Sequence, residues 1–178
     1  MKSAKDISAD EKVKLAAYGT ISVVMMGFIF SMSAQAGGES SSLSDAVAWQ
    51  VIGTLVPGFP GLGDQAQQEL FHTLTFVVRK TAHVTEYALL STFVTAAARQ
   101  AEAIATGRRK GEKPHASSWL TAVAGTGICI VYAVTDEFHQ LFVPGRTGLA
   151  SDVLVDSVGI VAAALITTAV VRACQRRR

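Results

Sequence analysis

Residues 70–98, LFHTLTFVVRKTAHVTEYALLSTFVTAAA, are numerous and apolar enough to cross a membrane, yet their centre carries four ionisable side chains. These are Arg79, Lys80, His83 and Glu86. An ionised group at the middle of a bilayer costs roughly 2.5–3.5 kcal/mol on insertion scales. Several such groups could not face lipid together, so we expect them to face other helices or a water-filled cavity.

The composition of the whole chain is that of a small membrane protein. Of its 178 residues, 49% are apolar and 17% are charged, whereas a soluble domain carries about 25% charged residues. Mean hydropathy is +0.34. We therefore predict an all-α fold in which residues 1–178 form one membrane domain. Its four transmembrane helices are expected at 15–34, 70–98, 119–143 and 153–171.

Lys and Arg are distributed unequally among the segments that join these spans. Four lie before the first span, five between the second and third, and four after the fourth, whereas the remaining connections hold Arg146 alone. Because positive residues favour the cytoplasmic side, we predict a multi-pass plasma-membrane protein with both termini in the cytoplasm. The basic pI of about 8.6 then reflects topology and does not indicate a nucleic-acid partner.

Two segments in the first third of the chain have alternative interpretations. Residues 1–36 end in an Ala-Gln-Ala sequence typical of signal-peptide cleavage, but acidic residues and a 20-residue apolar run favour a retained helix. Residues 44–56, SDAVAWQVIGTLV, are either an interfacial helix with Trp49 at headgroup depth or a loop with a few apolar residues.

Polar residues of the last three predicted spans share helix faces and, in the predicted orientation, the outer half of the membrane. On the second span, the polar residues lie within a face of about 120°. On the fourth span, Asp152, Asp156, Gly159 and Ala163 form an i, i+4 seam, and its small residues Gly159 and Ala163 permit close helix approach. The three sets are Arg79, Lys80, His83, Glu86 and Tyr87; Asp136, Glu137, His139 and Gln140; and Asp152 and Asp156.

Several chemistries fit such a set. His83 and Glu86, at i and i+3, could hold a metal, although no HExxH motif is present. His83 beside a carboxylate could act as a general acid or base, with Lys80 and Arg146 holding a phosphate or carboxylate. A proton path is a third chemistry, but the cytoplasmic halves of the spans lack ionisable residues. The structural interpretation is that polar groups hold the helices together.

Motifs with these residues occur in a characteristic order. Lys80-x-x-His83-x-x-x-Tyr87 precedes Asp136-Glu137-x-x-Gln140, which is followed by Arg146 in a Pro-Gly-Arg turn and by Asp152-x-x-x-Asp156-x-x-Gly159. Over residues 70–171 this order resembles the VanZ-like membrane protein family, whose founding member is associated with teicoplanin resistance. Asp156 departs from the Asn of that pattern. The resemblance implies a cell-envelope membrane protein linked to glycopeptide resistance, and it does not supply a reaction.

We therefore predict an outward-facing charged pocket that binds, and could modify, an anionic envelope lipid or a lipid-linked cell-wall precursor. The predicted catalytic residues are His83, Asp136 and Glu137. The predicted substrate-binding residues are Lys80, Tyr87, Gln140, Arg146, Asp152 and Asp156, and helix geometry alone adds Arg79, Glu86 and His139. We predict no metal and no cofactor. The alternative is a non-catalytic accessory protein in which the polar network locks the helices or binds a partner.

Overall fold

The computed structural model describes residues 9–107 and 118–176, and no residue within these ranges is in a β-strand. The described elements are α1 (Ala9–Ser33), α2 (Gly37–Leu55), the short 3-10 helix η1 (Phe59–Gly61), α3 (Asp64–Ala105), α4 (Ser118–Gln140) and α5 (Ala150–Arg176). The all-α prediction is confirmed. Part of the basic residues that entered the topology prediction, those in 1–8, 108–117 and 177–178, lie outside the described residues.

Three of the described helices are long and apolar enough to cross a membrane. They contain the stretches Ala9–Ser33, Trp119–Gln140 and Ala150–Cys174. The second predicted span, 70–98, lies within α3 and is not among the three, because its ionisable residues lower its mean hydropathy. Of the four predicted spans, three therefore correspond to helices with the length and composition of a membrane span.

The observed helices differ from the predicted spans mainly at their ends. α3 continues to Ala105, so that Arg99, predicted to begin a loop, is a buried helical residue. Its Nη2 donates a hydrogen bond of 2.8 Å to Thr168 Oγ1 on α5. α4 ends at Gln140 rather than near residue 143, and tight backbone turns follow it. Apolarity in the sequence therefore indicated where the helices run and gave their ends less accurately.

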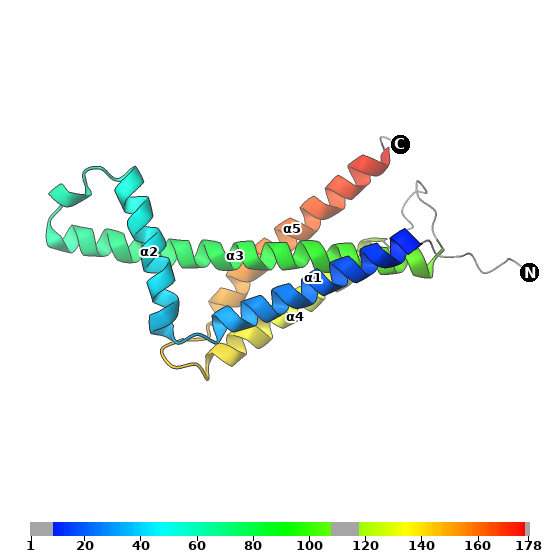
Figure 1. The fold of residues 1–178 in the computed structure, drawn as a ribbon, viewed down its shortest axis with the longest axis horizontal. Coiled ribbons are helices and arrows are strands. Elements are labelled where there is room, and N and C mark those ends of the chain that lie inside the picture. Colours follow the sequence, from blue (N-terminus) through cyan, green and yellow to red (C-terminus); the bar gives the residue numbers. More distant parts are fainter. Residues whose placement is uncertain (1–8, 108–117, 177–178) are drawn as a thin grey trace, which may run out of the picture.

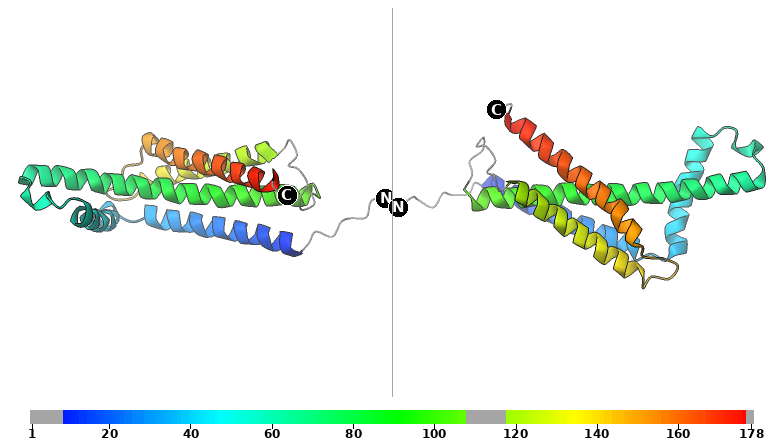
Figure 2. Two further views of the ribbon diagram at one scale, coloured as in Figure 1. Left: turned by 90° about the horizontal axis from the view of Figure 1, so that it is seen from above. Right: turned by 180° about the vertical axis from the view of Figure 1, so that it is seen from behind.

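α3 is the axis of the bundle. Its 42 residues give a length of about 63 Å at 1.5 Å per residue, and it packs against α1, α2, α4 and α5. Figure 2 shows α3 between α1 on one side and α4 with α5 on the other. The core around it consists of Ile29, Tyr87, Leu90, Val94, Cys129, Ala133 and Ile160. A chain segment rich in polar residues is thus enclosed by apolar helices.

α2 runs across the N-terminal half of α3, to which η1 and its flanking loops connect it (Figure 1). The Trp49 ring contacts Phe59 and Phe71, with centroids 5.7 and 4.8 Å apart respectively. Thr75 Oγ1 of α3 donates a 3.0 Å hydrogen bond to Asp45 Oδ1. Residues 44–55 are helical, which agrees with the interpretation of 44–56 as a helix and not with that of a loop.

The junction between α1 and α2 is attached to the loop between α4 and α5. Gly37 N donates a hydrogen bond of 3.0 Å to Pro144 O, and a Cβ at residue 37 would overlap the Gly145 carbonyl oxygen. Gly145 has a φ of +74°, in the left-handed region that glycine adopts without strain. This turn places Arg146 against the end of α1.

Candidate functional site

The predicted residues of α3 lie on two neighbouring stripes that face different helices. Arg79, His83 and Glu86 line a cavity shared with α1 and α2. Lys80 and Tyr87 instead contact side chains of α5 and α4. Both stripes follow the i, i+3, i+4 and i+7 spacing of one helix face. The polar residues of α3 were predicted to line a single pocket. In the structure, one stripe lines the cavity and the other contacts α4 and α5.

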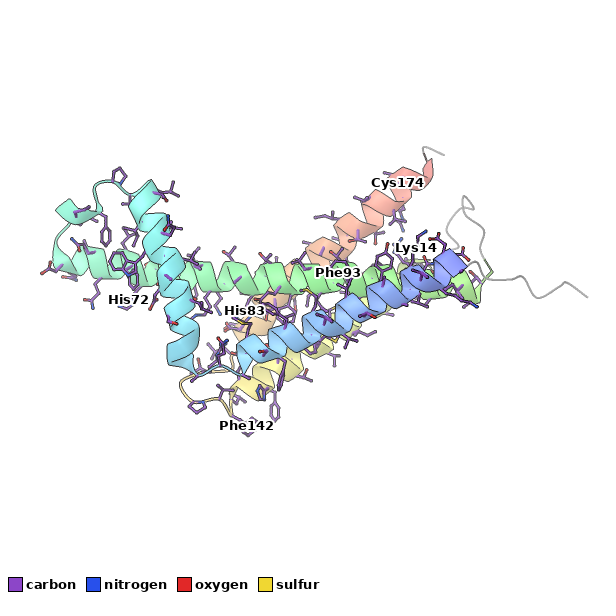
Figure 3. All side chains as sticks on the ribbon, viewed as in Figure 1. Lys14, His72, His83, Phe93, Phe142 and Cys174 are labelled. Carbon is purple, nitrogen blue, oxygen red and sulfur yellow. The ribbon has the colours of Figure 1, made fainter. Side chains whose placement is uncertain are left out.

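The cavity has a volume of about 160 Å³. It lies between the end of α1, one face of α2 and the middle of α3, where Figure 3 places His83; the labelled His72 lies beyond α2. Its lining residues are Met32, Ser33, Leu43, Ser44, Val47, Val78, Arg79, Ala82, His83, Glu86 and Arg146. The cavity thus combines two guanidinium groups, an imidazole and a carboxyl group with apolar side chains.

Arg146 holds the end of α1 while it lines this cavity. Its Nε donates to Gln35 O at 3.0 Å, and its Nη2 donates to Met32 O at 2.8 Å. Carbonyl groups at the end of a helix lack helical partners and carry the negative end of the helix dipole. Burial lowers the pKa of Arg146, and the positive charge of Arg79 lowers this pKa further. The charges of the two arginines therefore interact, while Asp136, Glu137 and Glu86 act on Arg146 in the opposite direction.

Asp136 is the centre of a buried hydrogen-bond network on the other side of α3. Its side chain is 2% exposed, and its Oδ2 accepts hydrogen bonds from Ser33 Oγ at 2.7 Å and Tyr87 OH at 3.1 Å. Gln140 Nε2 donates to the same oxygen at 3.3 Å. One carboxyl group thus joins α1, α3 and α4.

Glu137 extends this network to the loop that precedes α5. Its Oε1 accepts a hydrogen bond of 3.2 Å from Gln140 Nε2, and its Oε2 accepts one of 3.1 Å from Leu149 N. A Cβ at Gly148 would overlap the Glu137 carbonyl oxygen, so the loop packs directly on the end of α4. Glu137 and Gln140 accordingly fix where α5 begins, and neither lines the cavity.

Two acidic residues of α5 face α3. Lys80 Nζ forms an ion pair of 2.6 Å with Asp152 Oδ1, and both side chains are about one-fifth exposed. His83 Nδ1 lies 4.0 Å from Asp156 Oδ1, which is too long for a hydrogen bond. His83 was predicted to transfer a proton together with Asp136 or Glu137. In the structure, the carboxyl group that lies 4.0 Å from its Nδ1 is that of Asp156.

Three polar atoms around His83 are buried without a hydrogen-bond partner in the described part of the chain. They are His83 Nδ1, Asp156 Oδ2 and Asp136 Oδ1. A buried polar atom without a partner costs about 1–3 kcal/mol, and a catalytic role or a bound ligand is one of the explanations for such an atom. His83 is the one member of this group that also lines the cavity.

His139, predicted from helix geometry, lies elsewhere. Its ring packs against Phe30 of α1 with centroids 4.5 Å apart, and it is not among the cavity residues. Conversely, Ser33 and Ser44 line the cavity and were not predicted. Ser33 lies in an apolar run and Ser44 in a segment with two interpretations, so no local pattern in the sequence marked either residue.

No group of three or more His, Cys, Asp or Glu side chains in residues 9–107 and 118–176 has the arrangement of a metal site. His83 and Glu86 share the cavity with two arginines, whose positive charges disfavour a cation there. The expected absence of a metal and a cofactor stays a prediction.

Three long apolar helices around an axis that carries buried polar networks define a helical membrane protein. A family model described as VanZ/LLP1 matches residues 19–171, which is most of the chain. The chain belongs to the VanZ/LLP1 family and is a VanZ-like membrane protein, which confirms the prediction from its motifs. No curated protein and no solved structure matches the chain.

Proposed function

We propose that this protein crosses the plasma membrane four times, through α1, α3, α4 and α5, with both termini in the cytoplasm. The placement of α3 at the centre of three apolar helices supports its membrane location, since its polar stripes face the bundle. The unequal distribution of Lys and Arg supports the orientation. In this arrangement α2 lies at the outer interface, where Trp49 is 54% exposed.

Cysteine labelling tests the proposed orientation. Cys174 is exposed at the end of α5, and the proposal expects a membrane-impermeant maleimide to label it only after the cells are permeabilised. A Gly58→Cys substitution lies in open space between α2 and α3 and should be labelled in intact cells. Buried Cys129 serves as the unreactive control. Labelling of Cys174 in intact cells would show that the C-terminus lies outside the cell and would contradict the proposed orientation.

We further propose that the cavity binds the anionic headgroup of an envelope lipid or lipid-linked precursor. The observation that carries this proposal is the presence of Arg79 and Arg146 in one cavity with His83. Guanidinium groups bind carboxylates and phosphates through paired N–H donors. Lys80, predicted as the second clamp, is held by Asp152 and does not line the cavity, so we assign its role to Arg79.

Thermal unfolding in nanodiscs with and without anionic lipid tests this binding. A ligand that binds only the folded state raises the unfolding midpoint, and we expect anionic lipid to raise it relative to phosphatidylcholine alone. Arg79→Gln should abolish the increase. Lys80→Gln, one residue away but outside the cavity, should retain the increase. Its unfolding midpoint in phosphatidylcholine alone should be lower, because the variant loses the ion pair with Asp152. An increase that survives Arg79→Gln would show that lipid binds elsewhere.

A chemical step on this ligand would involve His83, because Asp136 and Glu137 do not line the cavity. His83→Ala should then leave the protein folded and inserted while it abolishes lipid turnover or glycopeptide resistance in cells. Resistance to teicoplanin is the phenotype to measure, with the amount of protein in the membrane as the reference. Activity that merely follows protein amount would contradict a chemical role for His83.

The second candidate function is a non-catalytic accessory in which the polar network locks the helices. The observation in its favour is that Asp136 alone joins three helices through hydrogen bonds. In that case Asp136→Asn would lower the unfolding midpoint and the phenotype together. Under the lipid-binding proposal, Arg79→Gln removes the phenotype together with the increase of the midpoint in anionic lipid, whereas Asp136→Asn retains that increase.

A further inference from the structure

The polar and apolar groups of the cavity are arranged by depth. Ser33 and Ser44 line the cavity and are only 1% and 9% exposed, respectively, so they belong to its buried part. Leu43 and Val47 of α2 line the same cavity but are 53% and 49% exposed, so they form its rim. A site for a water-soluble ion would present polar groups at the entrance. A polar interior with an apolar rim fits an amphiphile whose head enters and whose chain stays outside.

The volume of the cavity limits the size of the head. A cavity of about 150 Å³ in another protein holds a single benzene molecule, and this one measures about 160 Å³. One phosphate or carboxylate group fits such a space. A headgroup that carries sugars is several times larger and does not fit.

The N–H donors of the cavity match an anion with several oxygens. An arginine carries five N–H groups, and at Arg146 two of them serve the carbonyl oxygens of Gln35 and Met32, which leaves three to face a ligand. Arg79 lines the same cavity, so an anion that reaches both side chains would meet two guanidinium groups.

Glu86 distinguishes among anions because its carboxyl group also lines the cavity. It makes no hydrogen bond or ion pair within the described residues. A carboxylate beside an anionic ligand is tolerated when one proton lies between them. A phosphate monoester has a second ionisable oxygen with a pKa of about 6 and can supply that proton. A phosphate diester has no such proton, so it would fit beside Glu86 only if Glu86 itself were protonated.

We infer that the cavity takes a lipid monophosphate, with the phosphate monoester between Arg79 and Arg146, its P–OH donating to Glu86, and its hydrocarbon chain leaving over Leu43 and Val47. This inference rests on the proposed function, because it specifies which anionic lipid the cavity selects. It excludes lipid-linked precursors with sugar headgroups as ligands of this cavity.

Isothermal titration of the full-length protein in phosphatidylcholine nanodiscs tests the inference with four probes. They are dodecyl phosphate, its methyl ester, dodecanoate and inorganic phosphate. We expect dodecyl phosphate to bind about tenfold more tightly than its methyl ester and dodecanoate, which is the value of one charge-assisted hydrogen bond. Inorganic phosphate should also bind more weakly than dodecyl phosphate, because it lacks the hydrocarbon chain. Glu86→Gln should reduce the preference for the monoester over its methyl ester to less than about threefold.

Two further variants separate this inference from the proposed function. Arg79→Gln should weaken every anionic probe by about tenfold or more, and Arg172→Gln, exposed on α5 and remote from the cavity, should weaken none. Equal binding of dodecanoate and dodecyl phosphate would overturn the monophosphate assignment and leave anionic-lipid binding intact. Equal binding of inorganic phosphate would overturn the hydrocarbon-chain assignment. Failure of all four probes to bind would overturn the proposed function itself.

Discussion

Gly159→Ala tests the packing that brings α5 against α3 beside the candidate site. A Cβ at residue 159 would overlap the Val84 carbonyl oxygen and lie 3.1 Å from Val84 Cγ1. The main obstacle is backbone, which cannot rotate away, so the two helices must separate. That movement would also draw Asp156 away from His83 and weaken the hydrogen bond from Ser91 Oγ to Ile160 O, now 2.8 Å.

The size of the effect follows from comparison with Gly127→Ala on α4. A Cβ at Gly127 meets no atom within 4 Å, so this variant reports the gain in helix propensity alone, up to about 1 kcal/mol. Gly159→Ala makes the same gain and adds an overpacking cost of about 1–3 kcal/mol. The free energies of unfolding of the two variants should therefore differ by that cost.

Thermal unfolding of both variants in the same nanodiscs measures this difference. At roughly 2–4 °C per kcal/mol for a chain of this size, Gly159→Ala should unfold several degrees below Gly127→Ala. The parent protein should lie close to or slightly below Gly127→Ala. Equal midpoints for the two variants would refute the close approach of α3 and α5. All positional reasoning about Lys80 and His83 relative to α5 would then fail with it.

Three further outcomes are expected from unfolding measurements. Tyr87→Phe removes a buried donor from Asp136 and should cost about 1.5–3 kcal/mol; no change would place Tyr87 outside the network. A double-mutant cycle on Lys80 and Asp152, which are only partly buried, should give a coupling of about 1 kcal/mol or less, reduced by salt. Arg146→Lys cannot donate from both Nε and Nη2 to α1 and should cost about 1–2 kcal/mol; wild-type stability would contradict that attachment.

Much of this molecule could be predicted from local sequence. Apolar runs of about 20 residues marked α1, α4 and α5 because chain length and hydropathy are local properties. The polar centre of 70–98 indicated a helix enclosed by others, and the motifs indicated the family that the match over 19–171 then confirmed. Helix ends were less predictable, since α3 extends to Ala105 through tertiary contacts such as that of Arg99 with Thr168.

The division of the candidate site was decided by the tertiary structure alone. A helical arc specifies which residues of α3 lie on one side, but it does not specify which neighbour covers each part of that side. α1 and α2 cover the stripe of Arg79 and Glu86, whereas α4 and α5 cover the stripe of Lys80 and Tyr87.

Long-range contacts likewise brought residues to the site that carry no local signal. Ser33 donates to Asp136, which is 103 residues further along the chain, and it also lines the cavity. His83 meets Asp156 because Gly159 lets α5 approach α3 closely. The sequence by itself determined an all-helical membrane protein with charges directed inward, because hydropathy and periodicity act over a few turns. Which charges meet depends on the packing of whole helices, and only the tertiary structure decided it.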